Sequence, residues 1–214
     1  NNRRLLEQMA ELFESLIKLI NTALDEKSPY TGGHCERVPE LTMMLAEAAA
    51  SIEEGPLADF TMSEADRYEL KIAGLLHDCG KITTPVHVVD KATKLETLFD
   101  RIHLVDTRIE ILLRDAQIAH LKGEIDAAGL AARTRQLHAD REFLRRANIG
   151  GEFMSDADIA AVQRIASHAW TDLDGSARTL LSDEEAMNLG IRRGTLNAAE
   201  REVINNHIVM TIRM

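Results

Sequence analysis

Apolar residues recur at helical spacing along almost the whole chain, and this pattern limits the fold more than any other feature. Residues 3–24 carry two adjacent apolar stripes, and similar stripes follow in most later segments. The chain has only four prolines and 4% aromatic residues, and no segment alternates Val, Thr or Tyr with polar residues as a strand does. Since 45% of the residues are apolar, which is ample for a core, the sequence predicts an all-α fold.

Capping residues and helix breakers divide this pattern into separate helices. Ser63 with Asp66 and Ser155 with Asp158 are typical helix starts, and Gly80 is a typical stop. The two longest segments are highly charged and are separated by a glycine, so we expect a helical hairpin there. The expected helices are 3–24, 35–51, 63–77, 95–122, 125–147 and 155–169, a short one opening at Ser182 and a last one after Asn197; 81–91 is expected to be a connector and 170–195 to be loops.

The first expected helix has apolar residues at the alternating spacing of a heptad repeat. Two interpretations are equally open: a coiled-coil seam that pairs two chains, or a core helix with a broad apolar face. We expect a homodimer through this helix. Because the chain opens at Asn1 without methionine, we also expect an upstream sensor domain that this helix links to the rest. The seam residues are Leu5, Met9, Leu12, Leu16 and Leu19.

The net charge of −10 argues against a protein that wraps a nucleic-acid polymer, because such proteins neutralise phosphates with Lys and Arg. A small anionic nucleotide held by metal ions is compatible with that charge. No apolar run reaches the roughly 18 residues of a membrane-spanning helix, and no signal peptide opens the chain. Two cysteines, Cys35 and Cys79, make no disulfide framework, so we expect a cytoplasmic protein in which both are small packing residues.

The segment Gly74–Lys81 carries the strongest chemical signal, because it contains the dipeptide His77-Asp78 followed by glycine and lysine. A second histidine, His34, lies 43 residues earlier in the segment Thr31–Val38. Adjacent His and Asp offer an imidazole nitrogen and a carboxylate to one point in space, and a carboxylate can bridge two metal ions. A dinuclear centre of this kind suits the hydrolysis of phosphate esters.

The segments Pro29–Val38 and Leu75–Ile82 resemble the HD-GYP family, bacterial cyclic-di-GMP phosphodiesterases within the HD superfamily of metal-dependent phosphohydrolases. The resemblance implies an HD-domain helical bundle that hydrolyses cyclic-di-GMP as the output domain of a signalling protein. The long helical hairpin is interpreted as an insertion. The implied division is a signalling and dimerisation helix 1–27, a first core part 28–91, the hairpin insertion 92–147 and a second core part 148–214.

The same resemblance implies a metal shell. His34, His77 and Asp78 would hold one divalent ion, and Asp78 would bridge to a second ion held by His207. Iron or manganese is the expected metal. Some members of the family carry a glutamate in place of Tyr30 that recruits a third ion, so the tyrosine favours two ions.

By resemblance, Lys81 lies near a phosphate oxygen and offsets the charge that develops there, so Lys81 and Asp78 are the expected catalytic residues. Arg37 is expected either to reach a phosphate of the substrate or to form a structural salt bridge, which is the more ordinary role. Trp170 is expected to pack against the core. The other histidines lack partners at ligand spacing, so no functional role is expected for His87, His103, His120, His138 and His168.

The region around His207 is the weakest part of the resemblance. It lies 126 residues after Lys81, whereas the family usually needs a few dozen. The chain also ends at Met214, before the family's His-His pair, a further Asp and its Gly-Tyr-Pro signature, so we expect an incomplete metal shell and no activity. Two alternatives stay open: a non-catalytic signalling module, or an HD phosphohydrolase that acts on another nucleotide.

Overall fold

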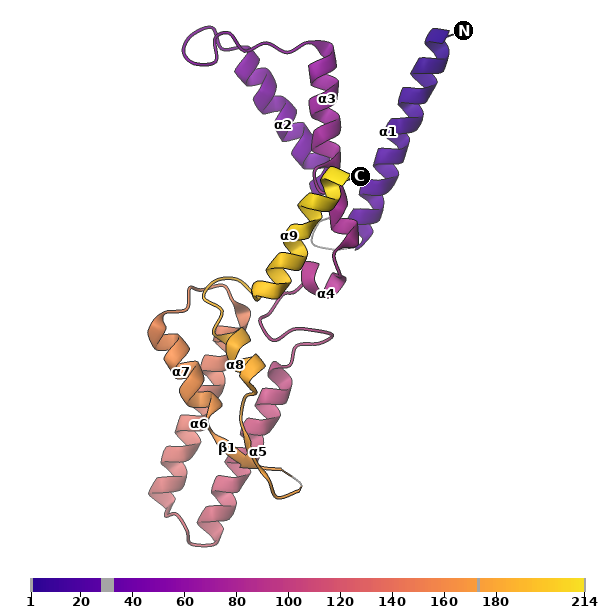
Figure 1. The fold of residues 1–214 in the computed structure, drawn as a ribbon. Coiled ribbons are helices and arrows are strands. Elements are labelled where there is room, and N and C mark those ends of the chain that lie inside the picture. Colours follow the sequence, from indigo (N-terminus) through magenta and orange to yellow (C-terminus); the bar gives the residue numbers. More distant parts are fainter. Residues whose placement is uncertain (1, 28–32, 173, 214) are drawn as a thin grey trace. The chain divides into compact units, whose positions relative to one another are not determined.

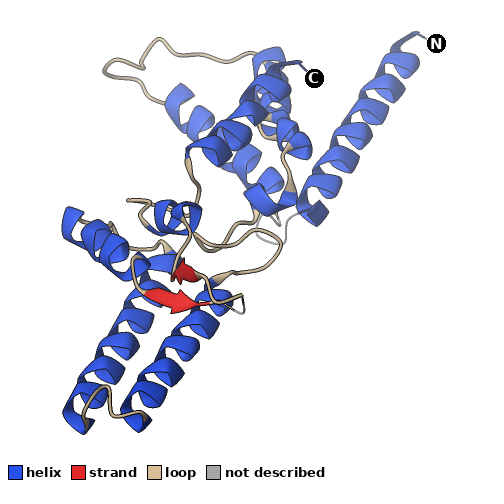
Figure 2. Cartoon of the chain, turned by 60° about the horizontal axis from the view of Figure 1, so that its bottom comes forward, coloured by secondary structure: helices blue, strands red, loops and turns tan. Residues whose placement is uncertain are grey.

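The computed structural model describes residues 2–27, 33–172 and 174–213, which form the predicted all-α fold with one very small sheet (Figures 1 and 2). None of the described helices is long and apolar enough to cross a membrane. The elements are α1 (Asn2–Lys27), α2 (His34–Ala50), α3 (Glu64–Leu76), the 3-10 turn η1 (Cys79–Thr83), α4 (Val86–Val89), α5 (Ile102–Leu121), α6 (Ala127–Ile149), α7 (Asp156–Ala166), β1 (Ala169–Thr171), β2 (Ala177–Thr179), α8 (Asp183–Leu189) and α9 (Ala198–Arg213).

The chain folds into two compact units. The first unit comprises Asn1–Asp90 and Glu202–Met214, and the second comprises Lys91–Arg201. Helix α9 therefore begins in the second unit and ends in the first. The four-part division that the resemblance implies stays a prediction.

In the first unit, α2 and α3 pack against each other, and α1 contacts both of them as well as η1. Ser63 and Asp66 form the predicted capping box at the start of α3. Within α1, Ile17 and Leu24 are buried. The heptad residues instead lie on the surface, each more than half exposed: Leu5 56%, Met9 67%, Leu12 72%, Leu16 52% and Leu19 66%. The seam is thus not a core face of this chain, and the homodimer stays a prediction.

The second unit is built on the predicted helical hairpin, formed by α5 and α6, with α7, α8 and the small sheet beside it. Trp170 packs against its core, as predicted. Ser155 and Ser182 each open a helix with a capping box, which fixes the starts of α7 and α8. The core includes Leu95, Val105, Ile109, Leu112, Leu144, Val162, Ile165, Leu180 and Leu189.

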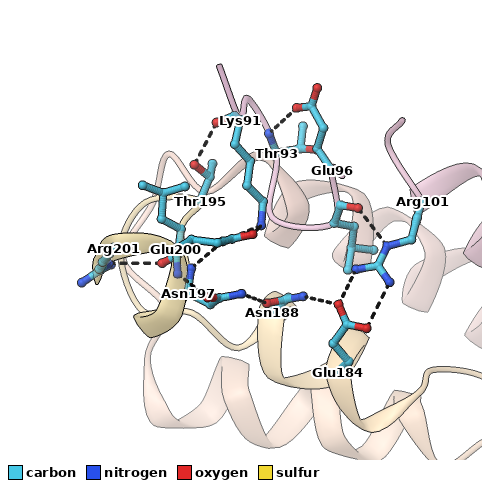
Figure 3. Close-up of polar contacts among 12 residues, drawn as sticks. Lys91, Thr93, Glu96, Arg101, Glu184, Asn188, Thr195, Asn197, Glu200 and Arg201 are labelled. Atoms are coloured by element: carbon cyan, nitrogen blue, oxygen red, sulfur yellow. Dashed lines mark hydrogen bonds and ion pairs between the residues drawn. The ribbon is translucent and has the colours of Figure 1, made fainter. Parts of the chain in front are cut away.

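A buried ion pair fixes the segment that enters α9 within the second unit (Figure 3). The ammonium group of Lys91 donates to both carboxylate oxygens of Glu200, each at 2.8 Å. The Asn197 side chain accepts from the backbone N–H of Glu200, and Glu200 accepts from that of Asn197, so the predicted cap is present. Thr195 also donates to the carbonyl of Lys91. Because a buried charge is costly without a partner, this network holds the start of α9 in one arrangement.

Some predicted boundaries were wrong. Helix α5 begins at Ile102 rather than at residue 95, because Asn148 from the end of α6 holds the preceding segment in turns. Its side chain accepts from the N–H of Leu95 at 2.8 Å and donates to the carboxylate of Asp100. The expected connector after Lys81 contains η1 and α4.

The expected loop region 170–195 also contains strand β2 and the last two residues of β1. The two strands pair antiparallel, with Trp170 opposite Arg178. At three residues each, they are too short to show an alternating pattern in sequence.

Candidate metal centre

Three side chains from the two motif segments converge in the first unit. His34 is the first residue of α2, and His77 and Asp78 follow the end of α3. The Nε2 atoms of the two histidines lie 3.3 Å apart and are 3.3 Å (His34) and 3.1 Å (His77) from Oδ2 of Asp78. Among the described residues, these three form the group of His, Cys, Asp or Glu side chains close enough to hold one ion.

His207 approaches the same carboxylate from the other side. Its Nε2 atom lies 3.5 Å from Oδ1 of Asp78, whereas His34 and His77 face Oδ2. The two oxygens of Asp78 therefore face two different sets of imidazoles. This is the arrangement in which one carboxylate serves two ions, although the ligand roles themselves stay a prediction.

Backbone carbonyls set the protonation of two of these histidines. Nδ1 of His77 lies 2.7 Å from the carbonyl oxygen of Gly74, and Nδ1 of His207 makes a short contact with that of Ile204. A carbonyl only accepts hydrogen bonds, so each Nδ1 carries a proton, and in the neutral imidazole it is Nε2 that offers a lone pair to the site. An outer partner of this kind commonly orients a metal-binding histidine.

Asp78 is ionised in this environment. It is only 8% exposed, and burial by itself would raise its pKa, but the hydrogen bond and charge of Lys81 and the charges of His77 and His207 lower the pKa overall. The ammonium of Lys81 lies 2.7 Å from Oδ2. Lys81 thus sits beside the carboxylate, within the cluster where the sequence placed it.

Gly80 is required by the close approach of α9. A Cβ atom at this position would lie 2.0 Å from the carbonyl oxygen of His207 and 2.6 Å from the backbone nitrogen of Thr211. The N–H of Gly80 also donates to the Thr211 hydroxyl at 3.0 Å. The glycine therefore lets α9 bring His207 to Asp78. Thr211 was not predicted, because its contact joins residues 131 positions apart.

The two cysteines are packing residues, as predicted. Cys35 and Cys79 are free thiols buried in one cluster with Leu24, against Ile20 and Leu76. Burial, with the nearby charges of Asp25 and Asp78, raises the pKa of Cys35 to about 11. A thiol with such a pKa stays protonated near neutral pH and is a poor metal ligand.

Of the remaining residues considered in the sequence, Arg37 is described by the structure and Tyr30 is not. The side chain of Arg37 is exposed, and its Nε donates to the carbonyl of Gly33 at 3.2 Å. Tyr30 falls outside the described residues.

Among the other histidines, His87, His103 and His138 are exposed. His168 lies 2.9 Å from the buried carboxylate of Asp140, and the expectation that it has no functional role stays a prediction. That contact joins residues 28 positions apart, which sequence spacing alone does not reveal.

Comparison with known proteins shows the family of this chain. The profile of the HD domain matches residues 31–162, which is more than half of the chain. This chain belongs to the HD domain family. The match includes His34, His77 and Asp78 and confirms the predicted HD domain.

A curated relative of this HD domain protein is 3'3'-cGAMP-specific phosphodiesterase 3 from Vibrio cholerae serotype O1. The two are 37% identical over 83 residues, which are 39% of this chain and 16% of the relative. The chain therefore spans only a small part of that protein. No solved structure gives a significant match.

The donor set of this HD site fits divalent metal ions. Imidazole nitrogens and a carboxylate suit iron, manganese and zinc, and the donor atoms of His34, His77 and Asp78 lie within 4.8 Å of one another. His34, His77 and Oδ2 of Asp78 would hold one ion, and Oδ1 of Asp78 with His207 would hold the other.

Proposed function

We propose that this chain is part of a metal-dependent phosphodiesterase that hydrolyses a cyclic dinucleotide, with cyclic-di-GMP as the substrate. The observation that carries the proposal is the placement of Asp78, whose two carboxylate oxygens face separate imidazoles. Membership of the HD domain family supports a metal-dependent phosphohydrolase. The similarity to a cyclic dinucleotide phosphodiesterase supports the substrate class.

Two bound divalent ions would stabilise the attacking and leaving oxygens of an in-line displacement at phosphorus. The side chains of this chain would hold the two ions at fixed positions. Asp78 is held ionised by Lys81, and the carbonyls of Gly74 and Ile204 accept from Nδ1 of His77 and His207, which leaves Nε2 of each neutral imidazole as the atom that can bind an ion. Lys81, which is one-quarter exposed and lies beside Asp78, would offset negative charge on a phosphate oxygen.

A second candidate substrate is 3'3'-cGAMP, because the curated relative is specific for that nucleotide. The two substrates share their phosphodiester linkages and differ in one base. The metal ions would act on the linkage and not on the base, so the proposed chemistry is the same for both.

We further propose that the protein acts as a homodimer through α1 and that a sensor domain controls it. The support is the exposed heptad stripe of α1, which this chain does not bury by itself.

Hydrolysis of cyclic-di-GMP and 3'3'-cGAMP by the manganese-loaded protein at its full natural length tests the proposal. We expect turnover of at least one of them, and its loss by more than about a hundredfold in His77→Ala and Asp78→Ala. His103→Ala, which changes an exposed histidine of the second unit, is the matched control and should keep full activity. A manganese-loaded protein that leaves both nucleotides intact would exclude the substrate class.

A further inference from the structure

The last turn of α1 contacts the backbone that carries the His77-Asp78 motif. The Nζ atom of Lys27 donates to the carbonyl oxygens of Lys81, Ile82 and Thr84 at 3.0, 2.6 and 2.5 Å. These carbonyls lie in the second half of η1 and directly after it, and that of Lys81 also accepts from the N–H of Thr84 at 3.0 Å. An ammonium has three N–H donors, so these three hydrogen bonds use the full donor capacity of Lys27. One of its acceptors belongs to Lys81, whose side chain holds Asp78.

The same turn of α1 also contacts the backbone that carries His34. Oδ2 of Asp25 accepts from the N–H of Gly33 at 3.1 Å. Gly33 is the N-cap of α2 and has a φ of 71°, a conformation that favours glycine. Asp25 also lies against the thiol of Cys35, on the other side of His34. Asp25 thus contacts both neighbours of that histidine, the backbone N–H of Gly33 and the side chain of Cys35.

Asp25 and Lys27, in the last turn of α1, therefore bond to the two motif segments that carry the predicted metal ligands. Ordinary packing of α1 is provided by Ile17 and Leu24, which are buried apolar residues. Asp25 and Lys27 are different, because Asp25 bonds to the main chain next to His34 and Lys27 bonds to the main chain that begins three residues after Asp78. Neither lies within the part of the chain that the HD profile matches, which begins at residue 31.

We propose that Asp25 and Lys27 are positioning residues through which α1 sets the geometry of the metal centre. A displacement of α1 would move the backbone of His34 relative to that of Asp78. Coupling between two sites is reciprocal, so an ion bound at the centre would in turn hold the last turn of α1 in place. The proposal deepens the proposed function, because it rests on the same metal site.

Manganese titration of matched variants tests the positioning role. Lys27→Met and Asp25→Asn should each weaken manganese binding by about tenfold or more, as is usual when an outer partner of a metal site is removed. Lys18→Met and Glu26→Gln make the same changes of charge at exposed positions of the same helix and should bind manganese like the unmodified protein. Alkylation of Lys27→Cys with bromoethylamine restores an ammonium at nearly the original length, so it should recover the affinity.

Amide hydrogen exchange gives a readout that is independent of turnover and of substrate. Without metal, the segments 33–38 and 79–84 should exchange faster in Asp25→Asn and Lys27→Met, respectively, than in the controls. Added manganese should slow exchange in residues 22–27 of the unmodified protein and have much less effect in Lys27→Met. The proposal is overturned if both variants keep the exchange rates of the controls.

The two proposals fail in different ways. If the unmodified protein binds no manganese, the metal site and the proposed function fail, while faster exchange in the metal-free variants still supports the two contacts as positioning contacts. If manganese binds with equal affinity in all variants, the positioning role fails and the metal site stands.

Discussion

At the scale of single residues, the site depends on a few atoms placed by backbone contacts. Two imidazoles are oriented by carbonyls three residues earlier, and Asp78 is kept ionised by Lys81. Sequence motifs identified His34, His77, Asp78 and Lys81, because these lie in two short segments with a recognisable order. The motifs did not reveal the side chains that contact the site from distant positions in the sequence, because such contacts follow no local pattern.

Gly80→Ala tests the close approach of α9. The added Cβ would clash with the backbone at His207 and Thr211, so we expect α9 to shift and His207 to leave Asp78. Overpacking of this kind costs about 1–3 kcal/mol in the free energy of unfolding. Urea unfolding and manganese binding measure the two effects. Gly151→Ala is the control, because its Cβ would meet its nearest atom at an ordinary 4.0 Å. A variant that behaves like this control would refute the steric argument.

At the scale of elements, helix periodicity and caps predicted most of the fold. The capping boxes at Ser63, Ser155, Ser182 and Asn197 each open a helix, because their signals lie within four residues. The late start of α5 and the pairing of β1 with β2 were missed. Both are set by contacts between segments about 50 and 10 residues apart, respectively, rather than by local preference.

Asp140 joins α6 to the end of α7 and makes this part of the second unit sensitive to acid. It is 2% exposed, and although burial would raise its pKa, hydrogen bonds from Arg164, His168 and Gln136 lower it overall. A lowered pKa stabilises the fold above the ordinary aspartate pKa of about 4, and this stabilisation is lost as the pH falls through the lower folded-state value.

Asp140→Asn should remove that pH-dependent contribution. We expect a loss of about 2 kcal/mol at neutral pH, less than for a fully buried pair because Arg164 is half exposed. Chemical unfolding between pH 2 and 7 measures it. Glu124→Gln, at an exposed position of the same unit, should leave the curve unchanged. An Asp140→Asn curve parallel to that of the unmodified protein would contradict the assignment.

The exposed stripe of α1 predicts association between chains. Leu12→Asp places a charge in the middle of the stripe, so it should convert a dimer to a monomer at tens of micromolar in sedimentation experiments. Leu98→Asp changes a leucine that is 95% exposed outside α1 and should leave the dimer intact. A monomer before any substitution would remove the basis for the homodimer.

At the scale of the whole molecule, the chain consists of two units, and the candidate centre lies entirely in the first. The resemblance predicted an HD domain, and the family match confirms it. The assignment of α5 and α6 to an insertion stays a prediction. The segment 202–214 belongs to the first unit, where α9 contacts the motif turn; the sequence indicated this only through the ligand role that the resemblance implies for His207.

The ions bound by single-site variants test the central claim most directly. In metal analysis of the manganese-loaded protein at its full natural length, we expect about two ions per chain, about one in His34→Ala and in His207→Ala, and none held tightly in Asp78→Ala. This pattern follows because Asp78 alone faces both sets of imidazoles. An Asp78→Ala variant that retains as much manganese as either histidine variant would contradict the bridging role and, with it, the proposed centre.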